Sequence, residues 1–483
     1  MATFRALRPR ARASLPVVLL SLVAGVAADV LFHPGAGGIG IATFSVLMCA
    51  CLAGGRYVRR AEALGVIAFT VLVAGVILFR SSPWVTIPAL LTLGGALGAA
   101  ASFGRQGSLF DLPWIEVAMR SVVAAVHALL TPFWLLRGAV ERIPLPTKPR
   151  AAALGRAMVI GIPIAGTLIL LFASADPVFA SIVAINLDPA EITTHVLLLG
   201  AGAFAVGLLV RVAAQSRDDV STPTVPGIMG NTEIVAILGA VAIVFAAFVG
   251  VQVATAFGVG RDSLAQQGIS FADYARSGYF QLLAVVVVTT VTLTAFDALA
   301  LRTDGKHSRG QRGLSLVIVG LALAVVGVAL RRLALYDDAY GLTMLRLACI
   351  PAAAWMCAVL LLIAAWTAGI GRSRHWLPGA VITTFAMTVL VFGAGNPEAF
   401  VATYDIQHAA SAHLDIDYLS TLSDDAVPSL VDSLPTLNGN DASRLKPLLC
   451  ARDRSGSGWA QDSVASIAAR NALVRLCGSA SSA

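Results

Sequence analysis

Long runs of apolar residues recur along the chain, and short polar stretches separate them. The hydrocarbon core of a bilayer is about 30 Å thick, so a helix that crosses it needs about 20 mainly apolar residues. The runs that meet this requirement predict eleven spanning helices, at residues 15–32, 36–55, 62–79, 83–103, 156–173, 194–214, 232–257, 279–301, 313–330, 343–366 and 376–396. The pattern therefore predicts an all-α polytopic transmembrane helix bundle.

The stretch 113–137 is ambiguous, because it contains Glu116, Arg120 and His127. Short cytoplasmic loops are enriched in Lys and Arg. If this stretch does not cross, 22 of the 28 basic residues in the membrane part lie on the side of the N-terminus; if it crosses, the two sides carry nearly equal numbers. Charge placement therefore predicts a cytoplasmic N-terminus, an outer C-terminus and a cytoplasmic, interfacial amphipathic segment at 104–155. The alternative is a weakly hydrophobic span held in place by its neighbours.

Composition changes sharply after the last apolar run. Residues 397–483 hold ten acidic and six basic residues, and their apolar positions recur at helical spacing. We expect a small helical extracytoplasmic C-terminal domain in this region, in which Asp424 or Asp425 caps one helix. The chain before it divides into a four-span segment at 1–103, the interfacial segment at 104–155 and a seven-span core at 156–396.

Two of the six cysteines belong to this C-terminal region, and the other four fall within predicted spans. A thiol within a span is usually a small apolar filler. The space outside the cytoplasmic membrane is oxidising, so we expect a Cys450–Cys477 disulfide, which would help a domain of this size to fold. Two buried free thiols are the alternative.

The composition agrees with a chain that is dissolved mostly in lipid. Of the 483 residues, 57% are hydrophobic and 13% are charged, about half the charged fraction of an ordinary soluble protein. The formal net charge is +7, but the positive excess belongs to the predicted cytoplasmic loops. We therefore expect a multi-pass protein of the cytoplasmic membrane, with membrane lipids and no nucleic acid among its partners.

Several polar motifs near the ends of the predicted spans are distinctive when taken together. The most specific is RLALYDDAYGLTMLR at 332–346, and the others lie at 172–180, 274–285, 396–397, 414–419 and 424–428. From about residue 155 to about residue 435 the chain resembles the bacterial polytopic membrane proteins of domain of unknown function 4153/4173; the first four spans and the last fifty residues contribute nothing to this resemblance. It implies an integral membrane protein, and the family has no assigned activity to carry over.

In the predicted topology most of these motifs face outside, where their polar residues form a candidate cluster. Its members are Asp176, Arg276, Arg332, Tyr336, Asp337, Asp338, Tyr340, Arg346 and Asn396. Arg346 lies just inside the tenth span, and an arginine there needs a partner, for which Asp337 or Asp338 is the nearest choice. The cluster is then either an ion-paired cap that fixes a turn at 336–340 or an outer site that binds a phosphate or carboxylate.

Four Asx residues, two of them members of this cluster, lie at span ends. Asp176 and Asn396 each precede a proline, and Asx-Pro ends helices; the other interpretation is a weak repeat whose Asx side chains line an outer vestibule. Asp29 and Asp297 also lie near span ends, where snorkelling or an interhelical hydrogen bond accounts for them.

Motifs of common enzyme classes are absent from the sequence. No GxxxxGK[ST], HExxH, CxxC or GxSxG occurs, and each of these would have indicated a known chemistry. The seven histidines are scattered along the chain. We therefore identify no catalytic residue and expect no cofactor and no metal site.

Three function classes remain open. Our first hypothesis is a non-enzymatic envelope scaffold or sensor whose outer C-terminal domain binds an extracytoplasmic protein partner. A secondary transporter is compatible with the prolines within spans, but no charge pair lies near a span centre. A membrane enzyme acting on a lipid-linked substrate at the outer face would use Asp337 or Asp338, but the first outer loop is too short to hold the acidic motif typical of such enzymes.

Overall fold

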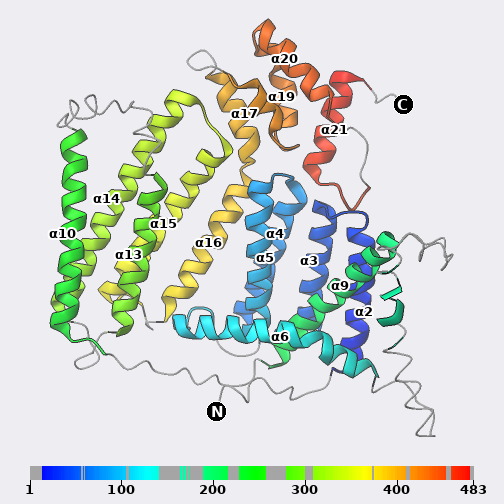
Figure 1. The fold of residues 1–483 in the computed structure, drawn as a ribbon, viewed down its shortest axis with the longest axis horizontal. Helices are drawn as coiled ribbons and strands as arrows, with labels where there is room; N and C mark the ends of the chain where they lie inside the picture. Colours follow the sequence, from blue (N-terminus) through cyan, green and yellow to red (C-terminus); the bar gives the residue numbers. More distant parts are fainter. Residues whose placement is uncertain are drawn as a thin grey trace.

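The computed structural model describes residues 13–55, 58, 60–104, 108–140, 189–215, 228–256, 279–299, 308–371, 375–408, 414–452 and 458–478, with scattered residues between 161 and 172. The membrane part consists of helices α2 (Leu15–Phe32), α3 (Gly38–Gly54), α4 (Ala61–Phe79), α5 (Pro83–Phe103), α6 (Trp114–Val140), α9 (Pro189–Gln215), α10 (Asn231–Ala256), α13 (Tyr279–Leu299), α14 (Arg309–Tyr340), α15 (Met344–Ala368) and α16 (Trp376–Ala394). Their arrangement is shown in Figure 1.

Within these described ranges, nine helices are long and apolar enough to cross a membrane. Helix α3 and the apolar part of α13 are shorter, and both coincide with predicted spans. The protein is therefore an all-α polytopic membrane bundle. The predicted span at 156–173 lies mostly outside the described residues.

Helix α6 corresponds to the ambiguous stretch. Its length and composition also suit a span, but in Figure 1 it runs across the ends of the other helices, on the side opposite the C-terminal domain. Arg120 and Glu116 form an ion pair of 2.7 Å on this helix, and Leu129 and Phe133 are exposed. Paired charges and exposed apolar side chains suit a helix that lies in a membrane interface, and we keep that assignment as a proposal.

The membrane helices pack around two separate hydrophobic cores. Side chains of α2, α3, α4, α5 and α9 form the first core, and side chains of α10, α13, α14 and α15 form the second. Helix α16 contributes Val389 to the first core and Leu377 to the second. The membrane part is therefore two helix bundles joined through α16, and α9 packs with the helices that precede it.

The C-terminal domain contains α17 (Pro397–Gln407), α18 (Ile416–Thr421), α19 (Val427–Ser433), the short helix η1 (Leu434–Thr436), α20 (Gly439–Cys450) and α21 (Val464–Cys477). A disulfide joins Cys450 to Cys477, the last residues of α20 and α21, with 5.8 Å between their Cα atoms. The core of the domain also includes Leu342, from the connection between α14 and α15, and Met344, the first residue of α15. The domain is therefore packed onto the membrane helices.

Two local predictions are wrong. The expected turn at 336–340 is helical, because α14 continues to Tyr340 and ends only at Gly341, whose φ of 75° suits glycine. Leu, Ala and Tyr are compatible with a helix, so the polar residues at 336–340 do not end α14. Neither Asp424 nor Asp425 is the N-cap of α19, which is Ala426.

Candidate functional site at the docked C-terminal domain

The side chain of Asp425 caps a membrane helix. Its carboxylate accepts hydrogen bonds from the backbone N–H groups of Ser81 and Ser82, at 2.7 Å each, and from the Ser81 hydroxyl at 3.0 Å. Ser82 is the N-cap of α5 and Ser81 precedes it, and the first N–H groups of a helix have no partner within the helix. Asp425 is 4% exposed, so a buried charge of the C-terminal domain satisfies them.

Glu398 and Arg80 surround this contact. The Ser82 hydroxyl donates to Glu398 at 2.6 Å, and the backbone N–H of Ser423 donates to the same carboxylate. The guanidinium of Arg80 donates to the carbonyls of Gly393 and Ala394, at 2.9 and 2.8 Å, and lies 3.6 Å from Asp425. We call Arg80, Ser81, Ser82, Glu398 and Asp425 the α5 junction. It ties the end of α16 and the start of α5 to the C-terminal domain.

Asn396 is the hinge between α16 and α17. It has a positive φ of 49°, its side-chain oxygen accepts from the N–H of Ala399, and its side-chain nitrogen donates to the carbonyl of Asp425 at 3.2 Å. The Asx-Pro pair therefore ends one helix and caps the next. Both hydrogen bonds of the Asn396 side chain therefore lie next to the α5 junction.

A second junction forms at the start of α15. The N–H of Leu342 donates to the Asp405 carboxylate at 2.8 Å, and the N–H of Met344 donates to the Tyr418 hydroxyl at 2.7 Å. A Cβ on Gly341 would lie 3.3 Å from a carboxylate oxygen of Asp405. We call Gly341, Leu342, Met344, Asp405 and Tyr418 the α15 junction.

Arg346 lies beside this junction. Its guanidinium is 3.8 Å from the carboxylate of Asp337 and also donates to the carbonyl of Gly341. The ion pair closes the connection between α14 and α15. This geometry is that of an ion-paired cap.

A third junction forms at the start of α3. The N–H groups of Ile39 and Gly40 donate to the carbonyls of Asp462 and Ala460, at 2.9 and 2.8 Å. The backbones approach so closely that a Cβ on Gly40 would lie 2.7 Å from the carbonyl oxygen of Leu31 and 3.0 Å from that of Ala460. The α3 junction (Ile39, Gly40, Ala460, Asp462) therefore depends on glycine.

Burial changes the acid–base properties of the docked domain. It raises the pKa of Asp405, although the Leu342 amide and the Arg346 charge act in the opposite direction. It also raises the pKa of Tyr418 and of Asp424. Arg452, beside Asp424 at 3.7 Å, has a pKa lowered by burial. Of these groups, Asp405 and Tyr418 belong to the α15 junction, so burial at this junction disfavours their charged forms.

Only part of the predicted outer cluster falls within the described side chains. Asp176 and Arg276 lie outside the described residues, and Tyr336, Asp338 and Tyr340 are described only as helical backbone. Arg332 donates to Gln252 of α10 at 3.2 Å. The structure thus joins Asp337 with Arg346, whereas Arg332 contacts a different helix and Asn396 belongs to the α5 junction.

Sequence reasoning missed most of the residues that carry the junctions. Ser82, Glu398 and Asp405 are ordinary polar residues near helix ends. One residue in the sequence could have indicated the α5 junction: Arg80 is a basic residue in a predicted outer loop, and such a residue needs an acidic partner.

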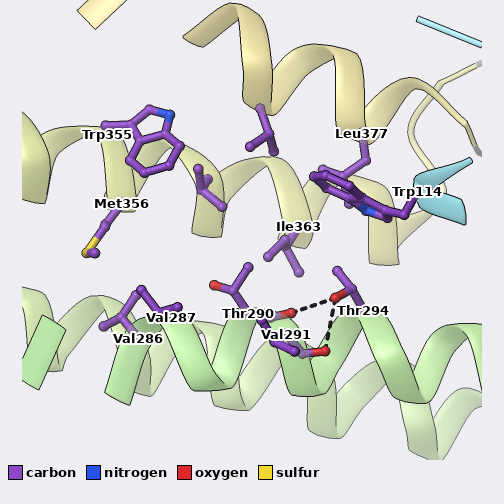
Figure 2. Close-up of a pocket in the computed structure, with 12 residues that line it drawn as sticks. Trp114, Val286, Val287, Thr290, Val291, Thr294, Trp355, Met356, Ile363 and Leu377 are labelled. Carbon is purple, nitrogen blue, oxygen red and sulfur yellow. Dashed lines mark hydrogen bonds between the residues drawn. The ribbon is translucent and has the colours of Figure 1, made fainter. Parts of the chain in front are cut away.

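An apolar cavity lies between α13, α15 and α16 (Figure 2). Its volume is about 140 Å³. Trp114 of α6 closes one end, and Trp355 lies near the other (Figure 2). The hydroxyl of Thr294 donates to the carbonyls of its own helix, at 2.9 and 3.0 Å. None of the described side chains that line the cavity is charged, so it suits an acyl chain better than an ion.

Comparison with known proteins agrees with this architecture. The sequence model of the family "Domain of unknown function (DUF4153)" matches residues 67–433, so the chain belongs to this family. The match begins within α4 and thus also includes α5 and α6, which the resemblance noted from motifs did not use. No curated protein and no solved structure matches the chain. The class is therefore an integral membrane protein that carries a domain of unknown function.

Proposed function

We propose that the protein is a non-enzymatic scaffold or sensor of the cell envelope, in which the C-terminal domain acts on the membrane helices as a clamp. One observation carries this proposal: the domain provides acceptors for the starts of α3, α5 and α15. Helices α3 and α5 belong to the first bundle and α15 to the second. A partner that displaced the domain would therefore release both bundles at once.

The carboxylates of the junctions support a structural role over catalysis. Asp425, Glu398 and Asp405 each accept hydrogen bonds from backbone amides. A general acid or base needs a side chain that can reach substrate, and these three side chains are turned toward helix ends. This favours the clamp over an enzyme that acts on a lipid-linked substrate.

The cavity likewise favours a scaffold or sensor over a secondary transporter. Transporters place charged or polar groups at the site where substrate and coupling ion bind. The lining of the cavity is apolar among the described side chains, and the hydroxyl of Thr294 is engaged with its own helix. This lining gives a coupling ion no ligand.

Charge placement supports the orientation that we propose for the clamp. In the predicted topology most basic residues of the membrane part belong to the cytoplasmic side. Helix α6 and the C-terminal domain lie at opposite ends of the membrane helices (Figure 1). Under the positive-inside rule, the domain faces the outside of the cytoplasmic membrane. It would there bind an extracytoplasmic protein.

The test compares undocking with deletion in cells. An Asp425→Ala variant should show the same envelope phenotype as deletion of the gene, at an abundance in the membrane equal to that of the wild type. The matched control is Asp432→Ala, because Asp432 is an exposed aspartate of the same domain. A variant in which the domain is undocked but the phenotype is fully restored would refute the clamp and would favour a membrane part that works alone.

A further inference from the structure

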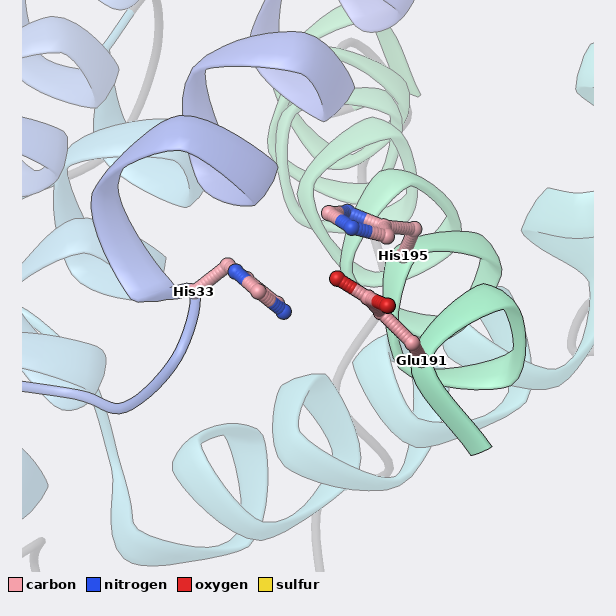
Figure 3. A group of neighbouring side chains, drawn as sticks. All are labelled: His33, Glu191 and His195. Atoms are coloured by element: carbon pink, nitrogen blue, oxygen red, sulfur yellow. The ribbon is translucent and has the colours of Figure 1, made fainter. Parts of the chain in front are cut away.

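Two histidines and a glutamate converge at one end of the helix pair α2 and α9 (Figure 3). His33 is the residue that follows α2, and Glu191 and His195 lie in the first turns of α9. One donor atom from each of the three side chains lies within 4.8 Å of the others. We propose that His33, Glu191 and His195 bind a divalent transition-metal ion, with Zn²⁺ as the ion that fits the donor set best.

Helix geometry accounts for the convergence. Glu191 and His195 are four residues apart, so their side chains project from the same face of α9. Helices α2 and α9 are in close contact: a Cβ on Gly25 would lie 2.5 Å from the carbonyl oxygen of Leu199, and one on Gly202 would lie 2.4 Å from that of Ala24. Small residues allow this approach, and it brings the end of α2 to the first turns of α9.

The carboxylate next to His195 also matches the surroundings of a metal-binding histidine. The Nδ1 atom of His195 is 2.7 Å from a carboxylate oxygen of Asp29. Histidines that bind metals usually donate their other ring N–H to a carboxylate, which fixes the tautomer and the ring orientation. Asp29 therefore leaves Nε2 of His195 for the metal.

The donor set points to zinc more than to calcium or magnesium. Two imidazoles and one carboxylate form a known zinc ligand set, to which a water molecule adds the fourth ligand. Calcium and magnesium prefer oxygen ligands alone. The rings of His33 and His195 are stacked with centroids 4.3 Å apart. Two nitrogen ligands of a tetrahedral zinc ion lie about 3.3 Å from each other, so the ring of His33 must rotate when the metal binds.

The proposed metal site is open to solution, and a side chain of the C-terminal domain binds the backbone next to it. The side chain of His195 is 38% exposed, which leaves a route for an ion and a water molecule. The side chain of Gln461 donates to the backbone carbonyls of His33 and Gly35, at 2.9 and 3.2 Å. In the proposed orientation the ion would come from the extracytoplasmic side. None of its three donors belongs to the C-terminal domain: Glu191 and His195 lie on α9, and His33 follows α2.

The test uses the full chain, purified in lipid nanodiscs and freed of metal with a chelator. Isothermal titration with Zn²⁺ should give one site per chain. His33→Ala and His195→Ala should each weaken binding by at least about 100-fold, and Asp29→Asn by about 10- to 100-fold. His408→Ala is the matched control, because it removes a histidine of the C-terminal domain, and should leave the affinity unchanged.

Two measurements keep the proposal falsifiable if a variant is misfolded. Each variant must elute as the wild type does in size-exclusion chromatography. Independently, Co²⁺ added to the wild-type protein should give the visible absorption of a four- or five-coordinate site with nitrogen and oxygen ligands, and Mg²⁺ should not compete. The proposal is overturned if the wild type binds no stoichiometric Zn²⁺, if His33→Ala His195→Ala binds as tightly as the wild type, or if Mg²⁺ displaces Zn²⁺.

Discussion

Replacing Asp425 with alanine tests the clamp most directly. The substitution removes a buried carboxylate that accepts two backbone hydrogen bonds of 2.7 Å at the start of α5 and lies 3.6 Å from Arg80. A hydrogen bond to a charged group contributes about 1.5–3 kcal/mol, and loss of one partner of a buried ion pair costs about 3–5 kcal/mol. These contributions overlap, so we expect docking of the domain to weaken by about 3–5 kcal/mol.

Hydrogen exchange measured by mass spectrometry reports the weaker docking as faster exchange of the amides that the domain protects. Because each 1.4 kcal/mol is a factor of ten in an equilibrium constant, the amides at the start of α5 should exchange about two to three and a half orders of magnitude faster. Asp425→Asn keeps one acceptor oxygen and should lose only about 1–2 kcal/mol. Asp432→Ala, on the exposed surface, should stay within about 0.5 kcal/mol of the wild type.

The pattern of exchange distinguishes the clamp from a general loss of stability. Amides at the start of α5 should be affected most, and those at the starts of α3 and α15 should follow if the domain leaves as a unit. Exchange at the start of α5 that stays within about threefold of the wild type in Asp425→Ala would refute the reasoning, because a buried charge with these partners cannot be removed without consequence.

Three further predictions concern the junctions and the domain. Gly40→Ala should lower the melting temperature of the purified protein through a clash that costs about 1–3 kcal/mol, whereas Gly54→Ala, which meets nothing within 4 Å, should not; equal effects would contradict the close approach. Cys450→Ser should destabilise the domain by about 3.5 kcal/mol, as the loop of 27 residues implies, and an unchanged denaturant midpoint would contradict this. Because the pKa of Asp405 is raised in the folded state, its stabilising contribution is complete below about pH 4 and is lost as the pH rises through the folded pKa. Domain stability should therefore fall less steeply with rising pH in Asp405→Asn, and identical pH profiles would contradict the burial.

The fold could be predicted because its main determinant is local. A run of about 20 apolar residues is sufficient to specify a spanning helix in lipid, where backbone groups must be satisfied within the segment. Helices α2, α4, α5 and α16 accordingly coincide closely with predicted spans. The error at the end of α14 has a local cause as well: polar residues at 336–340 continue the helix, and the turn needs only the glycine at 341.

The junctions could not be predicted because they join residues that are far apart in the chain. The expectation that Asp424 or Asp425 caps a helix of the C-terminal domain is wrong, because the sequence does not reveal that Asp425 binds the start of α5. Its partners Ser81 and Ser82 lie more than 340 residues away. The same limit applies to His33 and His195, which looked scattered along the sequence and are brought together only by the contact between α2 and α9.

The arginines on the side of the C-terminal domain link charge placement to the clamp. The predicted topology leaves few basic residues on this side, and an arginine near a span end there needs compensation. Arg80 obtains it from the carbonyl ends of α16 and from Asp425, and Arg346 obtains it from Gly341 and Asp337. Both guanidinium groups are therefore engaged with the protein itself. This favours the ion-paired cap over an anion-binding site, and it makes these exceptions to the charge bias part of the contacts that hold the helix ends in place.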